Sequence, residues 1–435
     1  MSLHARILTG LLAGAAAGTL VNFFAAGNPI VTTLVASVAE PFGRVWLNGL
    51  IMVVIPLIIS TVAVGVAGLG SLAHVGRIGL LTLLTFLVLT AAATGLGLLA
   101  VNVVQPGAGL DPAVTSRLME TYKGQAQGAI GLAQGALGIN TFVNMVPRNP
   151  IGAAANGEML AVIVFALFLG VGLTLVGRER AEPLRRVLES VGEVMVAIIE
   201  LIMKLAPLAV FALIFAVTAR FGFDVLASLI RYVLTVIACL AIFLFVAYAI
   251  ALRFVARRSP ADFFRKARIV MLTAFSTSSS NATLPTTLRV TEEELRVPSK
   301  IAGFVVPLGA TMNMNGTALF EGVTVLFLAQ VFGVVLSLPA QVVVLLMSVV
   351  TAIGTAGVPG GSIPLLMMVL GMVGVPMEGI AIVLGADRIL DMCRTTVNVT
   401  GDMVTATVVD RFERTEQPAA VIADRAAASR RASRS

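Results

Sequence analysis

The chain has few charged residues, cysteines and histidines, and each scarcity excludes a class of protein. Only 12% of its 435 residues are charged and 58% are hydrophobic, whereas a soluble domain is usually about 25% charged. Both cysteines, Cys239 and Cys393, lie in apolar segments, so no disulfide framework is implied. His4 and His74 are the only histidines, which disfavours a zinc or haem site. The composition therefore predicts a polytopic membrane protein.

The net charge of +7 would suggest a nucleic-acid partner in a soluble protein, but here the basic residues crowd into short loops. They gather around Arg77 and in the stretches 178–186, 253–268, 289–300 and 411–434. Because cytoplasmic loops carry an excess of Lys and Arg, we expect both termini in the cytoplasm and an even number of spans. The predicted setting is the lipid bilayer of the plasma (inner) membrane, with no nucleic-acid partner.

Apolar blocks long enough to cross the bilayer as helices lie near 7–25, 43–70, 78–104, 158–177, 194–219 and 224–256. The first block has no convincing cleavage site after it and is expected to be a retained span. Residues 105–156, rich in Gly, Asn, Gln and Pro, are either a mobile external loop or short helices along the membrane. The pattern predicts an all-α polytopic membrane protein with about eight transmembrane helices.

Two segments interrupt the apolar sequence after residue 256. Residues 271–288 (MLTAFSTSSSNATLPTTL) are rich in hydroxyls, and residues 352–364 (AIGTAGVPGGSIP) contain four glycines and two prolines. Irregular backbone survives at membrane depth only where it is buried in protein or lines a cavity, so both segments are predicted to be tips of re-entrant helical hairpins. The alternatives are a helix whose hydroxyls bond carbonyls four residues back, and an ordinary external turn.

Each predicted hairpin is followed by a polar helix. The first carries NMNGT at 313–317, and the second carries ADRILDMCRTTVNVTGD at 386–402. In the second, polar residues recur every three or four positions and share one helix face: Asp391, Arg394, Asn398 and Asp402. An ionisable side chain at membrane depth costs at least about 2.5–3.5 kcal/mol, so this face predicts a binding site. Hairpin plus polar helix, twice, is typical of inverted-repeat secondary transporters.

An enzyme is the function class that the sequence supports least. No imidazole lies near the polar cluster, and no nucleophile–base pair is visible. A channel-like anion conductance stays open as an alternative.

The motifs, in this order, resemble the dicarboxylate/amino acid:cation symporter family. The matching segments are SSSNATLP, NMNGT (against the family's usual NMDGT), AGVPGG and DMCRTTVNVTGD, and the likeness is strongest from about 270 to 405. The resemblance implies a homotrimer and an elevator mechanism. It also implies a division into scaffold (1–75 and 120–220), transport domain (76–119 and 221–412) and a disordered basic tail (413–435).

The resemblance further implies a site for an acidic amino acid. Arg394 would pair bidentately with the side-chain carboxylate, and Asp391, assisted by Thr395, would hold the α-ammonium. The α-carboxylate would bind Asn398 and backbone amides near Ser280. The remaining predicted substrate-binding residues are Ser279, Thr317, Gly357, Val358 and Gly360, the last three forming the tip of the second hairpin.

The chemistry of this face supports the same substrate independently, since a zwitterion with an acidic side chain needs one cationic and one anionic partner. Three alternatives stay open. Asp391 and Arg394 could form a purely structural ion pair. The substrate could be a neutral amino acid, or a C4-dicarboxylate, which Asp391 would repel.

Two cation sites are implied, with Na⁺ and/or H⁺ as coupling ions and no other cofactor. Asp402 with carbonyls of Gly309, Asn313 and Asn398 would hold one sodium ion, since hard cations prefer oxygen ligands. A second site would use carbonyls of Thr311, Ala352, Ile353 and Thr355. The alternative for Asn313 is a hydrogen bond that joins helices.

The chain departs from the family pattern at a third sodium site. Asn315 stands where the family has an aspartate, and an ungapped comparison puts Leu89 beside the matching Thr90 where a hydroxyl is expected. Losing the carboxylate removes the charge that balances a buried cation, so this site is predicted to be absent or weak. Glu321 occupies the position of a proton-carrying glutamate, and apolar surroundings favour the protonated carboxyl. The alternative for Glu321 is a helix-packing carboxylate.

Overall fold

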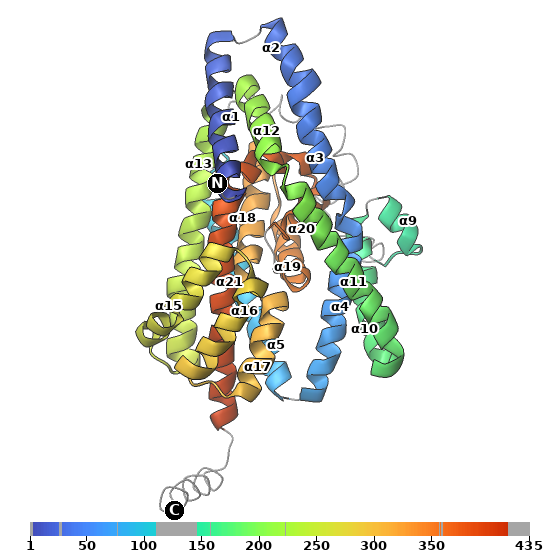
Figure 1. Cartoon of the computed structure of the whole chain (residues 1–435), viewed down its shortest axis with the longest axis vertical. Helices are drawn as coiled ribbons and strands as arrows, with labels where there is room; N and C mark the ends of the chain where they lie inside the picture. The colour runs from blue at the N-terminus through green and yellow to red at the C-terminus, as the bar shows by residue number, and fades with distance from the viewer. Residues whose placement is uncertain are drawn as a thin grey trace, which may run out of the picture.

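Helices make up almost all of the part of the chain that the computed structural model describes, and no strand occurs there (Figure 1). The described residues are 3–25, 28–75, 77–109, 146–156, 158–221, 223–355, 357 and 360–415. The tail from 416 onward and most of 105–156 lie outside them. The predictions for these two segments are therefore not tested by the structure.

The first half of the chain forms nine α-helices and one π-helical turn among the described residues. They are α1 (Leu3–Ala25), α2 (Pro29–Leu34), α3 (Glu40–Met52), α4 (Val54–Val75), α5 (Arg77–Val104), α9 (Pro150–Ala155), α10 (Met159–Val176), α11 (Arg178–Met203) and α12 (Ala206–Phe221), with a π-helical turn (Val35–Ala39) joining α2 to α3. Trp46 Nε1 donates to the carbonyl of Ile202 at 2.9 Å and so ties α3 to α11.

The second half contains the helices that the sequence analysis marked as functional. They are α13 (Phe223–Ile242), α14 (Tyr248–Ile250) between two π-helical turns (Phe243–Ala247 and Ala251–Val255), α15 (Pro260–Thr277), α16 (Ser280–Arg289) with a π-helical turn (Val290–Glu294), α17 (Ser299–Met312), α18 (Asn315–Val331), α19 (Leu338–Gly354), α20 (Ile363–Met372), a 3₁₀ turn (Met377–Ile380) and α21 (Ala381–Thr415).

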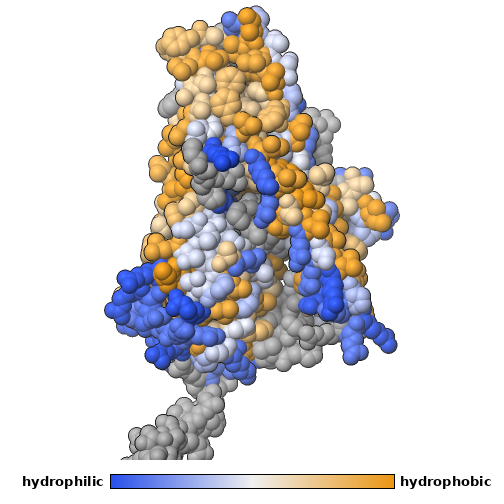
Figure 2. All heavy atoms as spheres, viewed as in Figure 1, coloured by the Kyte–Doolittle hydropathy of each residue, from blue (hydrophilic) through white to orange (hydrophobic). Residues whose placement is uncertain are grey.

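Long apolar helices confirm the prediction of a helical membrane protein. Within the described residues, five stretches are long and apolar enough to cross a membrane: 5–25, 29–67, 77–104, 225–255 and 299–331. The pair 179–203 and 206–220, bent by 61°, would be a sixth. In Figure 2, hydrophobic side chains cover the upper part of the molecule, and hydrophilic ones gather at the lower left over α15. Arg265 and Arg268 of α15 are exposed.

Both segments predicted as hairpin tips break the helix at the expected place. Ser278 has a left-handed backbone (φ 49°) that ends α15, and Ser279 caps α16 by accepting from the amide of Ala282 at 3.2 Å. The other break separates Gly354 of α19 from Ile363 of α20. Hydroxyls around the first break also bond carbonyls four residues back, as Thr283 does to Ser279 at 2.8 Å. The alternative of a helix whose hydroxyls bond carbonyls four residues back therefore describes the residues that flank the break. The helix itself is interrupted within the serine run.

The NMNGT motif also lies at a helix break. Asn313 and Met314 have non-helical backbone between α17 and α18 (ψ 61° and 57°). Such an interruption leaves backbone groups without helical partners, which is why it needs a protein surrounding at membrane depth. Both residues are buried, so this requirement is met.

Helix α21 runs through the core and carries the polar face to its centre. It packs against helices from both halves of the chain: α1, α5, α12, α13, α15, α17 and α18. Buried apolar residues such as Val397, Met403 and Val404 hold it in place. The polar residues between them are consequently buried as well, and their partners must come from the neighbouring helices.

A glycine repeat lets α1 approach α12 closely, and it yields a stability prediction. A Cβ added at Gly14 would lie 2.6 Å from the carbonyl oxygen of Phe211, a backbone atom that cannot rotate away. Gly14→Ala is expected to destabilise the protein by about 1–3 kcal/mol through overpacking. Gly172→Ala is the matched control, because nothing lies within 4 Å of that Cβ on α10. Thermal unfolding in detergent checks this, and equal transition temperatures for the two variants would contradict it.

Candidate functional site

The two helix breaks meet each other in space, although 78 residues separate them. Ser279 Oγ donates to the carbonyl of Gly357 at 2.8 Å, and the amide of Asn281 donates to the same oxygen at 3.3 Å. A Cβ at Gly357 would lie 2.9 Å from the carbonyl oxygen of Ala310, so this position requires glycine for close approach. Val358, predicted to belong to the same tip, lies outside the described residues.

A small cavity opens between the two breaks, the start of α18 and α21. Many of the predicted substrate residues line it: Ser280, Thr317, Gly357, Asp391, Thr395 and Asn398. Thr355, predicted for a cation site, is also in its wall. The sequence analysis did not select three further residues of the wall, Ser278, Met314 and Ser362. Ser278 and Ser362 directly adjoin predicted segments, and their position at the breaks could have indicated them.

Arg394 is fully buried and pairs with two carboxylates. Its Nη2 lies 3.0 Å from Asp387 Oδ1 and 2.9 Å from Asp391 Oδ1. Its Cζ lies 3.9 Å from the ring centroid of Phe320, a cation–π geometry. The ion pair between Asp391 and Arg394, considered above as an alternative, is thus formed. Both ion pairs use Nη2, whereas Nε and Nη1 are buried and have no hydrogen-bond partner among the described residues, so donors of the guanidinium are left for a carboxylate.

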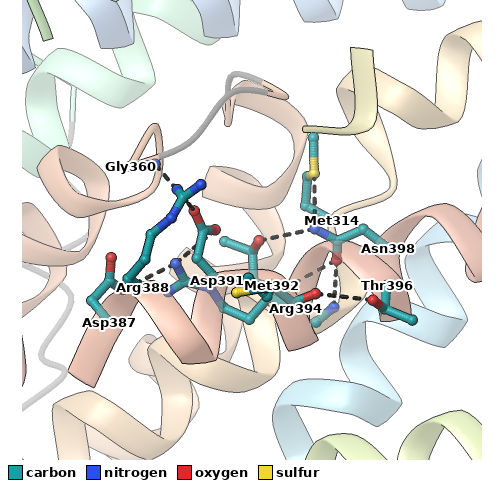
Figure 3. A network of polar contacts seen from close by, with 11 residues as sticks. Met314, Gly360, Asp387, Arg388, Asp391, Met392, Arg394, Thr396 and Asn398 are labelled. Atoms are coloured by element: carbon teal, nitrogen blue, oxygen red, sulfur yellow. Dashed lines mark hydrogen bonds and ion pairs between the residues drawn. The ribbon is translucent and has the colours of Figure 1, made fainter. Parts of the chain in front are cut away.

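A second arginine reaches Asp391 from the other side. Arg388 Nη1 lies 3.3 Å from Asp391 Oδ2, and the amide of Gly360 donates to the same oxygen at 3.4 Å (Figure 3). Gly360 has φ 76°, a conformation that favours glycine, and this turn aims its amide at α21. The second break is thereby tied to the charged face of α21.

Asp387 and Arg388 were missed by the sequence analysis. Asp387 precedes Asp391 by four residues, so the spacing of three or four that selected the face extends to it. The four residues Asp387, Arg388, Asp391 and Arg394 are each at most 8% exposed, and their formal charges sum to zero. A buried cluster of this kind tolerates its charges only because they are paired.

Asn398 joins α21 to the start of α18. Its Oδ1 accepts from the amides of Gly316 at 2.7 Å and Thr317 at 3.3 Å, and its Nδ2 donates to Thr317 Oγ1 at 3.1 Å and contacts the sulfur of Met314 at 3.2 Å. The amide therefore lies at the cavity but is engaged with the NMNGT motif. Its predicted role toward a carboxylate would involve its Nδ2 group.

Asp402 lies deeper along α21, beside the break between α17 and α18. Asn313 Nδ2 donates to Asp402 Oδ1 at 2.8 Å, and a Cβ at Gly309 would lie 2.3 Å from that oxygen. The structure thus brings together Gly309, Asn313 and Asp402, with Asn398 one turn earlier on α21. Asn313 Oδ1 is buried and has no hydrogen-bond partner among the described residues. A partnerless oxygen beside a buried carboxylate fits a hard cation such as sodium.

The second predicted cation set lies at the ends of α17 and α19, which contact each other. Thr311 is in the last turn of α17, and Ala352 and Ile353 are in the last turn of α19. Thr355 follows that turn, and its Oγ1 donates to the carbonyl of Thr351 at 2.8 Å. Thr311 therefore borders the NMNGT break, and Ala352, Ile353 and Thr355 border the second helix break.

Asn315 is held in a neutral hydrogen-bonded chain. Thr90 Oγ1 donates to Asn315 Oδ1 at 2.8 Å, Asn315 Nδ2 donates to Tyr248 Oη at 2.9 Å, and Tyr248 Oη donates to the carbonyl of Val397 at 2.9 Å. All of these side chains are buried, Thr90 at 2% exposure and the others completely. Both polar atoms of the amide are satisfied by protein groups, as burial requires.

Glu321 is completely buried on α18 and faces α19. Thr351 Oγ1 lies 2.6 Å from Glu321 Oε2 and also 3.1 Å from the carbonyl oxygen of Ser348. A hydroxyl has one hydrogen to donate. Both contacts become good hydrogen bonds together if Thr351 donates to Ser348 and accepts a proton carried by Glu321. The geometry therefore accommodates a protonated carboxyl.

Fold and site together define a helical membrane protein in which a buried, charged cluster and a small polar cavity lie at two helix breaks. The model of the sodium:dicarboxylate symporter family matches residues 3–412. The chain belongs to this family.

Named relatives agree with this assignment over almost the whole chain. The chain is 36% identical over 420 residues to a proton/sodium-glutamate symport protein of Bacillus subtilis, covering 95% of this chain and 94% of the relative. It is 35% identical to a proton/glutamate-aspartate symporter of Escherichia coli (95% and 93% covered). It is also 32% identical to a C4-dicarboxylate transport protein of Azorhizobium caulinodans (86% and 82% covered).

Proposed function

We propose that this protein is a secondary active symporter that takes up acidic amino acids together with Na⁺, H⁺ or both. The observation that carries the proposal is the placement of Asp391 in the wall of the cavity between the two helix breaks, with Arg394 bound directly to it. An acidic amino acid carries one ammonium and two carboxylates, and this pair offers opposite charges 2.9 Å apart. Relatives named as glutamate and aspartate symporters support the same substrate class.

In this proposal the substrate exchanges partners with the buried ion pair. Asp391 accepts the α-ammonium, and Arg394, released from Asp391 but still held by Asp387, turns its planar fork to the side-chain carboxylate. The polar groups around Ser280 and Asn398 hold the α-carboxylate. Exchange keeps Asp391 and Arg394 each paired with an opposite charge, which lowers the penalty of separating them in a buried site.

Competition for labelled L-aspartate binding to the purified protein tests the substrate class. L-Aspartate and L-glutamate are expected to displace the label at concentrations at least about tenfold lower than L-alanine or L-serine, since those lack the carboxylate that Arg394 would bind. Equal competition by acidic and neutral amino acids would reject an acidic substrate.

For the coupling ions, we propose one sodium ion at Asp402, Gly309, Asn313 and Asn398, and a second at the ends of α17 and α19. Asp402 supplies the negative charge that a buried cation needs. The satisfied amide of Asn315 supports the absence of a third sodium site, because no carboxylate balances a cation there. Glu321 is the proposed proton carrier in its place.

Glu321→Gln is expected to remove the response of uptake to an imposed inward proton gradient. Glutamine has the shape of a protonated glutamate and can still bond Thr351, so folding should be preserved, but it cannot release a proton. Uptake of labelled L-aspartate into proteoliposomes, with and without the proton gradient, measures this. Glu293→Gln on the surface is the matched control, because that side chain is 64% exposed. Stimulation of the Glu321→Gln variant equal to wild type would assign Glu321 a packing role.

For the architecture of transport, we propose that the two breaks are tips of re-entrant hairpins. The segments 76–119 and 221–412 would move as a transport domain against a scaffold of 1–75 and 120–220, within a homotrimer. The basic loops support a cytoplasmic location for both termini. Hydrogen bonds join the first tip to the second at Gly357, and the second tip to α21 at Gly360, which supports motion of the two tips and α21 as one unit.

A further inference from the structure

One side of the stretch 225–255 is apolar and exposed along most of its length. This stretch has 31 residues, is long and apolar enough to cross a membrane, and contains α13 and α14. Its opposite side packs into the core through buried residues such as Tyr232, Val236 and Phe243. An apolar helix face that stays open in a membrane-crossing stretch contacts hydrocarbon. The large side chains of this face recur at steps of four or eight: Ile230, Leu234, Ile242, Val246, Ile250 and Phe254.

This apolar face ends at two exposed arginines. Arg253 follows Ile250 by three residues, and Arg257 follows Phe254 by three residues. Phe254, which lies between the two arginines in the sequence, is 73% exposed. A guanidinium is costly in hydrocarbon, and a long arginine side chain near the end of a span extends to the headgroups. The boundary between acyl chains and headgroups is therefore expected at this end of the stretch.

Helix α15 shows the same change between basic and apolar residues, in the reverse chain direction. Its first half carries the exposed Arg265 and Arg268, and the apolar Leu272, which is 63% exposed, follows at helical spacing. The helix lies beside the end of the apolar stretch, since the ring centroids of Phe264 and Phe245 are 5.5 Å apart. In Figure 2 the hydrophilic region over α15 lies below the hydrophobic surface. Two neighbouring helices thus place arginines at the edge of an exposed apolar face.

The positive charge of this region is largely unopposed. Residues 251–270 include six basic residues and a single acidic one, Asp262. Asp262 is bound by Arg265 and Lys266, and Arg258 pairs with a carboxylate of α21 at 3.2 Å. The other three basic residues have no ion-pair partner among the residues that the structure describes: Arg253, Arg257 and Arg268. These three arginines are therefore available to a negatively charged partner.

We propose that Arg253, Arg257 and Arg268 bind the phosphate groups of anionic phospholipids in the leaflet at this end of the stretch. This inference rests on the membrane-crossing stretch and not on the proposed transport function. A guanidinium pairs with phosphate through two parallel hydrogen bonds, and apolar residues beside the arginines, such as Phe254 and Leu272, contact the acyl chains. Anionic headgroups are favoured over zwitterionic ones, because the latter carry a cation that the arginines repel.

The test is binding of dioleoylphosphatidylglycerol to the purified full chain in detergent, with bound lipid counted by native mass spectrometry and dioleoylphosphatidylcholine as the zwitterionic comparison. Wild type is expected to reach half-saturation with the anionic lipid at a concentration at least about tenfold lower than with the zwitterionic lipid. The triple variant Arg253→Gln/Arg257→Gln/Arg268→Gln should raise the half-saturating concentration of the anionic lipid at least about tenfold and leave that of the zwitterionic lipid unchanged. Arg289→Gln is the matched control and should match wild type, because that exposed arginine already pairs with Glu293.

Equal half-saturation of wild type by the two lipids would overturn the inference, and so would a triple variant that binds the anionic lipid as wild type does. Displacement of the bound lipid by inorganic phosphate at an equal concentration would also overturn it, because a free anion would then fill the site without acyl chains. If the triple variant is not monodisperse, the double variant Arg253→Gln/Arg268→Gln takes its place, with an expected rise of at least about fivefold. None of these outcomes depends on transport, so the proposed function is tested separately.

Discussion

Arg394→Ala is expected to reduce the preference for L-aspartate over L-alanine by roughly 100-fold, because a bidentate charged hydrogen bond to a carboxylate is worth about 3 kcal/mol. Affinity for L-alanine should change much less, since that substrate offers no second carboxylate. Competition against a labelled substrate, or direct calorimetric binding, gives the ratio. Retention of the wild-type preference would show that Arg394 does not bind the substrate side chain.

The same substitution leaves Asp387 and Asp391 with a single nearby arginine, so a matched variant is needed. Removing one partner of a buried ion pair typically destabilises by about 3–5 kcal/mol. Combining Arg394→Ala with Asp387→Asn restores the net charge of the cluster to zero without restoring the guanidinium of Arg394. If the double variant is stable and still lacks acidic preference, the loss belongs to recognition. If it regains the preference, the effect of the single variant was structural.

The second large effect is expected at Asp402. Asp402→Asn should weaken the dependence of L-aspartate binding on sodium by at least about tenfold in apparent sodium affinity, because the only formal charge of the proposed cation site is removed. The asparagine can keep a hydrogen bond to Asn313, so the fold should persist. Titrating sodium at fixed labelled L-aspartate measures the change. Sodium dependence equal to that of wild type would exclude Asp402 as a sodium ligand.

The opposite change, from an amide to a carboxylate, can be made at Asn315 to test why the third sodium site is missing. Asn315→Asp adds a carboxylate where Thr90 and Tyr248 now satisfy a neutral amide. If the third sodium site is missing for lack of this charge, the steepness of the sodium dependence should increase in this variant. An unchanged steepness would mean that the neighbouring groups, and not the charge alone, decide against a third ion.

The face of α21 could be predicted from sequence because its information is local. Asp391, Arg394, Asn398 and Asp402 recur at helical spacing within apolar sequence, and charge at membrane depth is informative by itself. Asp387 shares the spacing, and extending the pattern by one turn would have found it. Arg388, three residues before Asp391, fits the same spacing. Its contact to Asp391 depends on side-chain direction, which the spacing does not determine.

Contacts between distant segments could not be predicted in the same way. The sequence indicates that Gly357 lies in an irregular tip, but only the structure brings it to Ser279 and to the carbonyl of Ala310. Likewise, hydroxyl-rich sequence indicates a break without saying which residue turns. Ser278 takes the left-handed conformation, and Ser279 is free to cap α16.

Charged residues also obscured the start of one long helix. The apolar block near 43–70 belongs to a helical stretch that begins at Pro29. Glu40 and Arg44 lie within this stretch, and their charges lower the hydropathy of its first part. The structure shows why these charges are tolerated: Glu40 forms a 2.6 Å ion pair with Arg220 of α12 and a longer one with Arg44. A hydropathy profile scores each charged residue as if it were unpaired, whereas in the structure Glu40 and these arginines form ion pairs.

The most direct test of the account is concentrative uptake of labelled L-aspartate into proteoliposomes containing the purified protein, with sodium and proton gradients imposed separately. The account predicts accumulation above the external concentration under an inward sodium gradient, a further increase when an inward proton gradient is added, and no accumulation when both gradients are collapsed. Uptake that only equilibrates L-aspartate under every gradient would contradict symport and indicate a passive conductance. Failure to take up L-aspartate at all would contradict the assignment of Asp391 and Arg394 to an acidic amino acid.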